Sequence, residues 1–160
     1  MNTRVVALTV VTALLGFAGS ASANELIVTP VASKAGQVSM AFDIVSSGDI
    51  AGFNFKVSMP GLVKKKGELA SCVAELPKGF SGACSVQDGG IYVFATSDSP
   101  SVSLPAGVVS VGTVSVSYNA PLAKARGQSA LTIEEFAFFD NKANPLAVKA
   151  RIDTGLAGAK

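Results

Sequence analysis

The sequence contains no histidine and no tryptophan. Without histidine the chain has no imidazole base, no Ser–His or Cys–His nucleophile pair and no imidazole metal ligand, so the commonest catalytic designs are excluded. Charged residues are also scarce, at 15% of 160 residues, and the formal net charge is only +2. No basic run is interleaved with aromatic residues, so we expect no nucleic-acid partner. On this composition we expect the protein not to be an enzyme.

Apolar residues, by contrast, are abundant. They make up 49% of the chain, which is the composition of a folded protein and not of a disordered one. A length of 160 residues predicts a single folded domain.

The first 23 residues have the order of a secretory signal peptide. Arg4 precedes an unbroken apolar or neutral stretch from Val5 to Phe17, and small residues follow up to Ala21-Ser22-Ala23. A membrane anchor is the alternative, but a membrane-spanning helix needs about 20 apolar residues. We therefore expect cleavage after Ala23, a domain over residues 24–154 and a frayed tail over residues 155–160. The product is expected to be secreted or periplasmic, with no membrane span in the mature chain.

The chain has only two cysteines, Cys72 and Cys84. The stretch between them contains Pro77, Gly79 and Gly82, and in an oxidising compartment such a pair predicts a disulfide. Closing a loop of about 15 residues stabilises a fold by roughly 3 kcal/mol. A redox pair is disfavoured because no C-x-x-C spacing exists, and two ligands do not make a metal site. We expect a structural disulfide and neither a metal nor a cofactor.

From Asn24 onward the apolar residues recur with a period of two, which predicts strands. Two alternating segments, 38–44 and 53–59, flank the turn signal Ser46-Ser47-Gly48-Asp49. Further strands are predicted over 26–31, 91–96, 108–118, 131–138 and 146–152. No amphipathic helix is indicated. Seven or more strands with turn-rich connections predict an all-β, single-domain β-sandwich or jelly roll.

In two of these strands the apolar residues change parity. Val109 and Val111 give way to Val114 and Val116, and Ile133 gives way to Phe136. A slip of one residue turns side chains to the other face, so we expect a bulge or bend near Gly112 and another at Glu134-Glu135.

Four segments are candidate sites. Glu134 and Glu135 are the only adjacent carboxylates, but neighbours on a strand point to opposite faces and do not form a close acid–base pair. Asp140 to Pro145 has a partial likeness to a calcium loop, but Lys142 opposes cation binding and the glycine is missing, so a hairpin turn is favoured.

The other two candidates are Lys64-Lys65-Lys66 and Ile91-Tyr92-Val93-Phe94. The lysines either attract an acidic partner or form a solvated loop, and the solvated loop is favoured. The second segment is either a strand covered on both faces or a partly exposed aromatic strip that binds a ligand. We favour the covered strand.

Two parts of the chain taken together resemble the cohesin domain. The stretch from Gly48 to Pro60 resembles the cohesin hairpin in which a short I-A-x-x-x-F strand leads to a proline turn. The closing stretch resembles the end of cohesins, with a glycine-containing strand at Val108–Gly112, an aromatic strand at Phe136–Asp140 and a turn at Asn144–Leu146.

The resemblance implies a jelly-roll sandwich of about nine strands, related to cellulose-binding modules, that is not catalytic. Cohesins bind dockerin modules through one sheet face, and the positions here that match their outward polar residues are Gly52 and Asn54. We therefore expect recognition of a protein partner, dockerin-like or another exported protein, through the face that includes Asn54 and Lys56. The alternatives are a polysaccharide partner and a structural subunit of a surface assembly whose edge strands pair between chains.

Overall fold

The computed structural model describes residues 24–34, 36–59, 61–63, 69, 71–118 and 131–153. The expected signal peptide, the Lys64-Lys65-Lys66 run and the tail over 155–160 lie outside the described residues, and what the sequence predicts for them stays a prediction.

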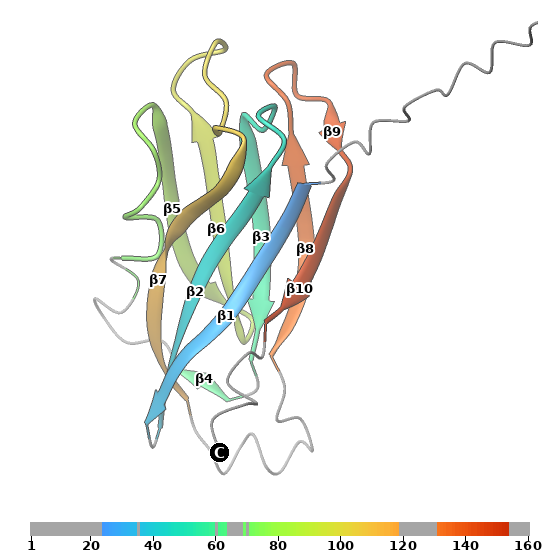
Figure 1. Ribbon diagram of the computed structural model, residues 1–160. Helices are drawn as coiled ribbons and strands as arrows, with labels where there is room; N and C mark the ends of the chain where they lie inside the picture. The colour runs from blue at the N-terminus through green and yellow to red at the C-terminus, as the bar shows by residue number, and fades with distance from the viewer. Residues whose placement is uncertain are drawn as a thin grey trace, which may run out of the picture.

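The described residues form ten strands in two sheets, and no helix (Figure 1). The first sheet has the order β10-β1-β2-β7-β4 and the second the order β5-β6-β3-β8-β9. The prediction of an all-β sandwich is therefore confirmed. The strands are β1 (Asn24–Lys34), β2 (Gln37–Ser46), β3 (Gly52–Ser58), β4 (Leu62–Val63), β5 (Phe80–Gln87), β6 (Gly90–Ser97), β7 (Gly107–Tyr118), β8 (Thr132–Phe139), β9 (Pro145–Leu146) and β10 (Val148–Ile152).

The two alternating segments that flank the turn signal Ser46-Ser47-Gly48-Asp49 belong to different sheets. β2 pairs with β1 and β7 in the first sheet, whereas β3 pairs with β6 and β8 in the second. Ser46 to Gly52 therefore crosses between the sheets. The predicted strand over 146–152 is also divided into β9 and β10, which lie in different sheets. β10 pairs in parallel with β1 and thereby brings the two ends of the described domain together.

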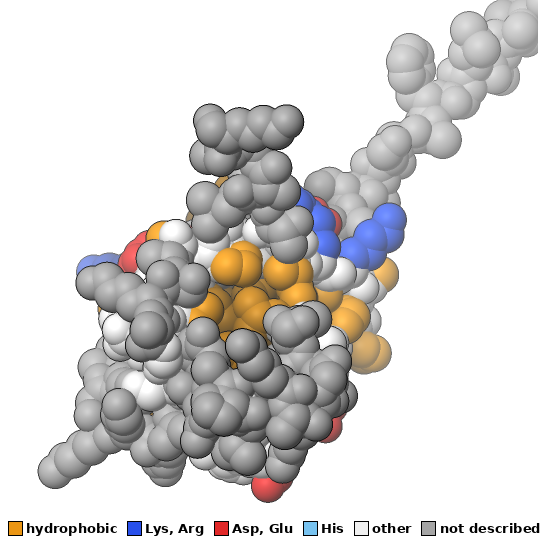
Figure 2. Space-filling model, turned by 90° about the horizontal axis from the view of Figure 1, so that it is seen from below, with side chains coloured by type: hydrophobic (Ala, Val, Ile, Leu, Met, Phe, Trp, Pro, Cys, Tyr) orange, Lys and Arg blue, Asp and Glu red, His pale blue; other side chains and the backbone are white. Residues whose placement is uncertain are grey.

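The core lies between the sheets and is made of the residues with regular alternation. β2 buries every second side chain, and Phe42 and Ile44 are fully buried. Across the sandwich the Phe42 and Phe55 rings meet edge to face at 5.2 Å. Each such ring removes a large apolar area from water, so the core supplies most of the stabilisation. Viewed along the strands, apolar side chains gather at one end of the sandwich (Figure 2).

Both predicted bulges are present. In the pairing of β2 with β7 the register shifts where Phe42 faces Gly112 and Asp43 faces Ser110. In the pairing of β3 with β8 it shifts where Asn54 faces Ala137 and Lys56 faces Glu134. Beyond the bulge in β7, Val114 and Val116 return to the core, which accounts for the change of parity. Beyond the bulge in β8, Phe138 is fully buried but Phe136 remains 36% exposed.

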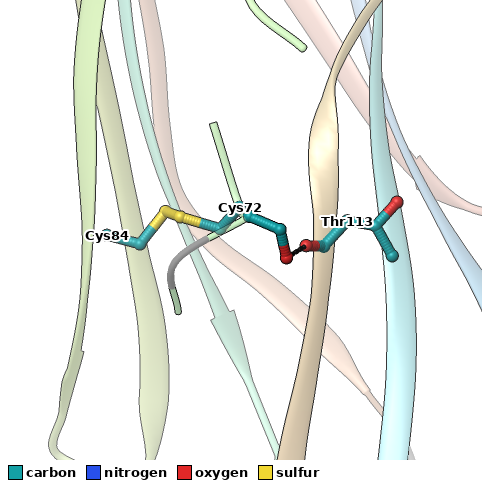
Figure 3. The surroundings of a disulfide bond; sticks show 4 residues. Cys72, Cys84 and Thr113 are labelled. Atoms are coloured by element: carbon teal, nitrogen blue, oxygen red, sulfur yellow. Dashed lines mark hydrogen bonds between the residues drawn. A yellow bond between two sulfur atoms is a disulfide. The ribbon is translucent and has the colours of Figure 1, made fainter. Parts of the chain in front are cut away.

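A disulfide joins Cys72 and Cys84, with Cα atoms 6.5 Å apart (Figure 3). Cys84 belongs to β5 in the second sheet, whereas the segment that carries Cys72 is bonded to β7 in the first sheet: the Thr113 amide donates to the Ser71 oxygen at 3.2 Å and the Glu75 amide to the Val111 oxygen at 3.1 Å. The disulfide therefore links the two sheets along one side of the sandwich.

Candidate functional site

The outer face of the second sheet holds the residues that the sequence singled out. On β3 the side chains of Phe53, Phe55 and Val57 are buried in the core, so Gly52 and Asn54 lie on the opposite, outer face. Asn54 is exposed, and the neighbouring strands place Phe94 of β6 on one side of it and Ala137 of β8 on the other.

A shallow groove of about 500 Å³ crosses this face at the end of the sandwich that lies uppermost in Figure 1. Its floor is formed by the first half of β3 and the second half of β6. Its rims are the loop after β6 and the turn between β8 and β9. The residues that line it include Gly52, Asn54, Phe94, Asp98, Phe139 and Asp140.

Backbone hydrogen bonds of Ala51 hold these elements together. The Ala51 amide donates to the Phe139 oxygen at 2.8 Å, and the Ala51 oxygen accepts from the Ser97 amide at 2.7 Å. Ala51 itself is buried. The end of β8 and the end of β6 are therefore fixed to the start of β3, so the groove is a preformed feature of the sheet.

Phe94 is the apolar centre of the groove, and the interpretation favoured for its segment is wrong. Ile91 and Val93 are buried as expected, but Tyr92 and Phe94 lie on the outer face and Phe94 remains 54% exposed. The segment is thus an aromatic strip open to solvent on one side. Exposed aromatic rings with polar neighbours are typical of the centres of protein interfaces.

Lys56 lies on the predicted face, but its ammonium group already contacts Glu134 and the Tyr92 ring of the same protein. Its Nζ lies 3.4 Å from Glu134 Oε2 and 5.1 Å from the centre of the Tyr92 ring. Hydrogen bonding with Tyr92, and then with Glu134, raises the pKa of Lys56 above its usual value. Hydrogen bonds from Ser58 and Lys56 lower the pKa of Glu134. This part of the face is locally neutral.

The bulge in β8 separates the two adjacent carboxylates. Glu134 faces Lys56 across the sheet, and Glu135 occupies the bulge itself with a φ of 50°. Both side chains are exposed. Glu134 is therefore engaged in an ion pair with a lysine of the neighbouring strand.

The segment from Asp140 to Pro145 is a hairpin turn between β8 and β9, as favoured. Asp140 Oδ1 accepts from the amides of Lys142 and Asn144, both at 2.8 Å, and Oδ2 accepts from Asn144 Nδ2 at 2.9 Å. These bonds, the Asn144 side chain first, lower the pKa of Asp140. The carboxylate stabilises the turn, and no group of three or more potential metal-ligating side chains occurs among the described residues.

The groove has a negative rim. Asp98 and Asp140 stand on its two sides, and the described residues that line it include no lysine or arginine. Asp98 is exposed, and its Oδ1 accepts a hydrogen bond from the Ser81 hydroxyl at 2.6 Å. A ligand for this groove would therefore meet an apolar ring and two carboxylates, of which Asp140 also feels the charge of Lys142 in its own turn.

Three parts of this groove were not identified from the sequence: Asp98, Phe139 and the loop after β6. Ser97-Asp98-Ser99-Pro100 is a turn signal directly after a predicted strand, and this was the one available pointer to a rim. The described residues also contain no helix that is long and apolar enough to cross a membrane.

This sandwich has a cohesin-like fold. A type I cohesin from Clostridium thermocellum, solved in a cohesin–dockerin complex, matches with 18% identity and a TM-score of 0.53 over 82% of this chain and 94% of that one. A non-cellulosomal cohesin from Archaeoglobus fulgidus matches with 15% identity and a TM-score of 0.52 over 84% and 94%. A type II cohesin of the ScaA scaffoldin of Acetivibrio cellulolyticus matches with 11% identity and a TM-score of 0.54 over 83% and 94%.

No protein-family model matches the sequence, and the search of curated proteins gives no match. The resemblance noted in the sequence is therefore confirmed as a likeness of fold.

Proposed function

We propose that this protein is an exported, non-catalytic module that recognises a partner protein through the groove on the outer face of its second sheet. The observation that carries the proposal is Phe94, an aromatic side chain left 54% exposed in a preformed groove beside Asn54. Covering an aromatic ring of this size would remove a large apolar area from water, which favours a contact at this position.

The chemistry of the groove indicates what the partner presents. An apolar side chain would cover Phe94, and a lysine or arginine near it would meet Asp98 or Asp140. Asn54 would fix the orientation by hydrogen bonding. The Clostridium thermocellum cohesin was solved in complex with a dockerin, so a dockerin-like module is the first partner to test, with other exported proteins after it.

Export is part of the proposal. A structural disulfide is stable in an oxidising compartment, and the segment that ends at Ala23 has the order of a signal peptide. A partner would accordingly be found in the periplasm or outside the cell.

The test is capture of a partner from the secreted fraction of the source organism with the immobilised mature protein as bait, with calcium and again with a chelator. The captured protein is then purified and its affinity measured by calorimetry. Phe94→Ala should weaken binding at least about tenfold, because truncating a central aromatic side chain typically costs about 2 kcal/mol or more. Val108→Ala is the matched control, since Val108 is also apolar and 73% exposed but lies on the first sheet.

Equal effects of the two substitutions would contradict the proposal. Affinity electrophoresis tests the alternative that the groove binds a polysaccharide. Retardation of the wild-type protein in a polysaccharide gel, abolished by Phe94→Ala and unaffected by Val108→Ala, would assign the groove to a glycan.

A further inference from the structure

Exposed sheet edges carry backbone groups that can pair with another chain, and proteins usually protect them with charges, proline, short strands or covering segments. Three edges of this sandwich have such protection. β10 carries the exposed residues Lys149 and Arg151. β9 consists of two residues and begins with Pro145. The edge of β7 is occupied by β4 and by the segment that carries Cys72.

β5 differs from the other edge strands. It has eight residues, none of them charged and none of them proline, and its register with β6 runs without a bulge from Phe80 to Gln87. Within the described part of the chain, no backbone hydrogen bond joins Ser81–Gln87 to any segment other than β6. Ser81, Ala83 and Gln87 are exposed. β5 therefore presents a long and uncharged edge at the margin of the second sheet (Figure 1), and the segment that carries Cys72 is joined to it through the side chain of Cys84.

We propose that β5 pairs with β5 of a second copy of this chain in antiparallel orientation, forming a twofold dimer. The charges at the ends of the strand favour this occupant. Lys78 precedes β5 and Asp88 follows it, and both are exposed. An antiparallel register centred on Ala83 sets the end of each strand that follows Lys78 beside the end of the other strand that precedes Asp88, with no like charges opposed along the strand.

The pairing joins two five-stranded sheets into one continuous sheet. Residues directly opposite each other in an antiparallel pair lie on the same face, so the outer faces of both copies point the same way. The two grooves then open on the same face of the joined sheet, at opposite ends of it, and a partner with two binding segments long enough to span both would be held bivalently. This consequence rests on the proposed function, whereas the dimer itself does not.

The test is sedimentation equilibrium of the mature protein over a range of concentrations. The wild type should show a monomer–dimer equilibrium. Ala83→Lys should raise the dimer dissociation constant at least about tenfold, because a lysine on an edge strand opposes edge-to-edge pairing. The matched control is Thr132→Lys, which adds the same charge at an exposed position of β8, on the far side of β3 and β6 from β5.

A second pair of variants tests the ends of the strand. Lys78→Glu, which opposes two carboxylates at each end of the dimer, should weaken dimerisation severalfold, whereas Lys149→Glu on β10 should leave it unchanged. Circular dichroism verifies that each variant is folded.

Three results would overturn the proposal. These are a wild type that stays monomeric at every concentration, equal effects of Ala83→Lys and Thr132→Lys, or a dimer that is lost on Phe94→Ala but kept in Ala83→Lys. The last result would place the contact between copies at the groove. Partner affinity is measured separately with Phe94→Ala, so failure of the dimer and failure of the proposed function are distinguishable.

Discussion

The side chain of Lys56 lies along the sheet instead of extending into solvent. Gly90 on the adjacent strand makes this possible, because a Cβ at that position would stand 2.6 Å from Lys56 Cε. The ammonium group is then held by Glu134 and the Tyr92 ring. With its pKa raised, Lys56 remains a cation at neutral pH, but its charge is balanced within the face.

Asp140 is held as a carboxylate by the backbone and side chain of its own turn. Three hydrogen bonds hold its pKa below the ordinary value of 3.8, so its carboxylate stabilises the fold above that pH and loses the effect as the pH falls through the lower, folded-state pKa. Replacing the first of these donors, by Asn144→Ala, should raise the pKa of Asp140 toward 3.8. Carbon-detected NMR titration of the carboxyl group measures both values. A wild-type pKa at or above 3.8 would contradict this account.

The exposure of Phe94 could not be predicted from the sequence. Alternation in Ile91-Tyr92-Val93-Phe94 places two side chains on each face of a strand, and both pairs are apolar. Which pair is covered depends on where the second layer lies, and residues far away in the chain decide that. The position of Asn54 on the outer face was predictable, since its neighbours Phe53 and Phe55 alternate with polar residues.

The bulge in β7 contains Gly112, and the segment that carries Cys72 packs against β7 at this position. Gly112 has a φ of 154°, and a Cβ there would lie 2.6 Å from the Cys72 backbone oxygen and closer still to that of Ser71. The segment that carries Cys72 thus reaches β7 only because residue 112 has no side chain. The parity change in the sequence predicted the bulge but not the segment that packs against it.

Gly112→Ala should lower the free energy of unfolding by at least about 2 kcal/mol, since overpacking against rigid backbone typically costs about 1–3 kcal/mol and an unfavourable φ adds to it. Gly107→Ala is the matched control: Gly107 also has a positive φ, of 108°, but a Cβ there would meet nothing within 4 Å. Urea unfolding of both variants separates crowding from backbone strain. Equal losses would show that the Cys72 segment does not press on β7.

β5 was the long strand that the sequence did not predict. Its residues, FSGACSVQ, are mostly small and lack the alternation that marks a half-buried strand. The burial pattern explains this, because an edge strand beside the disulfide has no fully buried side chain. The same composition leaves the edge without charge, and for that reason β5 is the strand proposed to pair with a second copy.

At the scale of the whole molecule, the all-β class, the two bulges and the cysteine pairing followed from periodicity, parity and compartment. The division of strands between sheets did not, because period-two patterns are the same in either sheet. The fold places β3, β6 and β8 side by side, and with them residues from three distant parts of the sequence, at one groove. The groove is therefore a product of topology that local patterns do not encode.

An NMR titration of the isotope-labelled mature protein with the purified partner tests directly whether the outer face of the second sheet is the recognition surface. We expect the largest amide shift changes on β3, β6 and the β8–β9 turn, around Asn54, Phe94 and Asp140. They should disappear in Phe94→Ala at the same partner concentration and persist in Val108→Ala. Changes centred instead on the first sheet, around β2 and β7, would contradict the assignment of the outer face of the second sheet as the recognition surface.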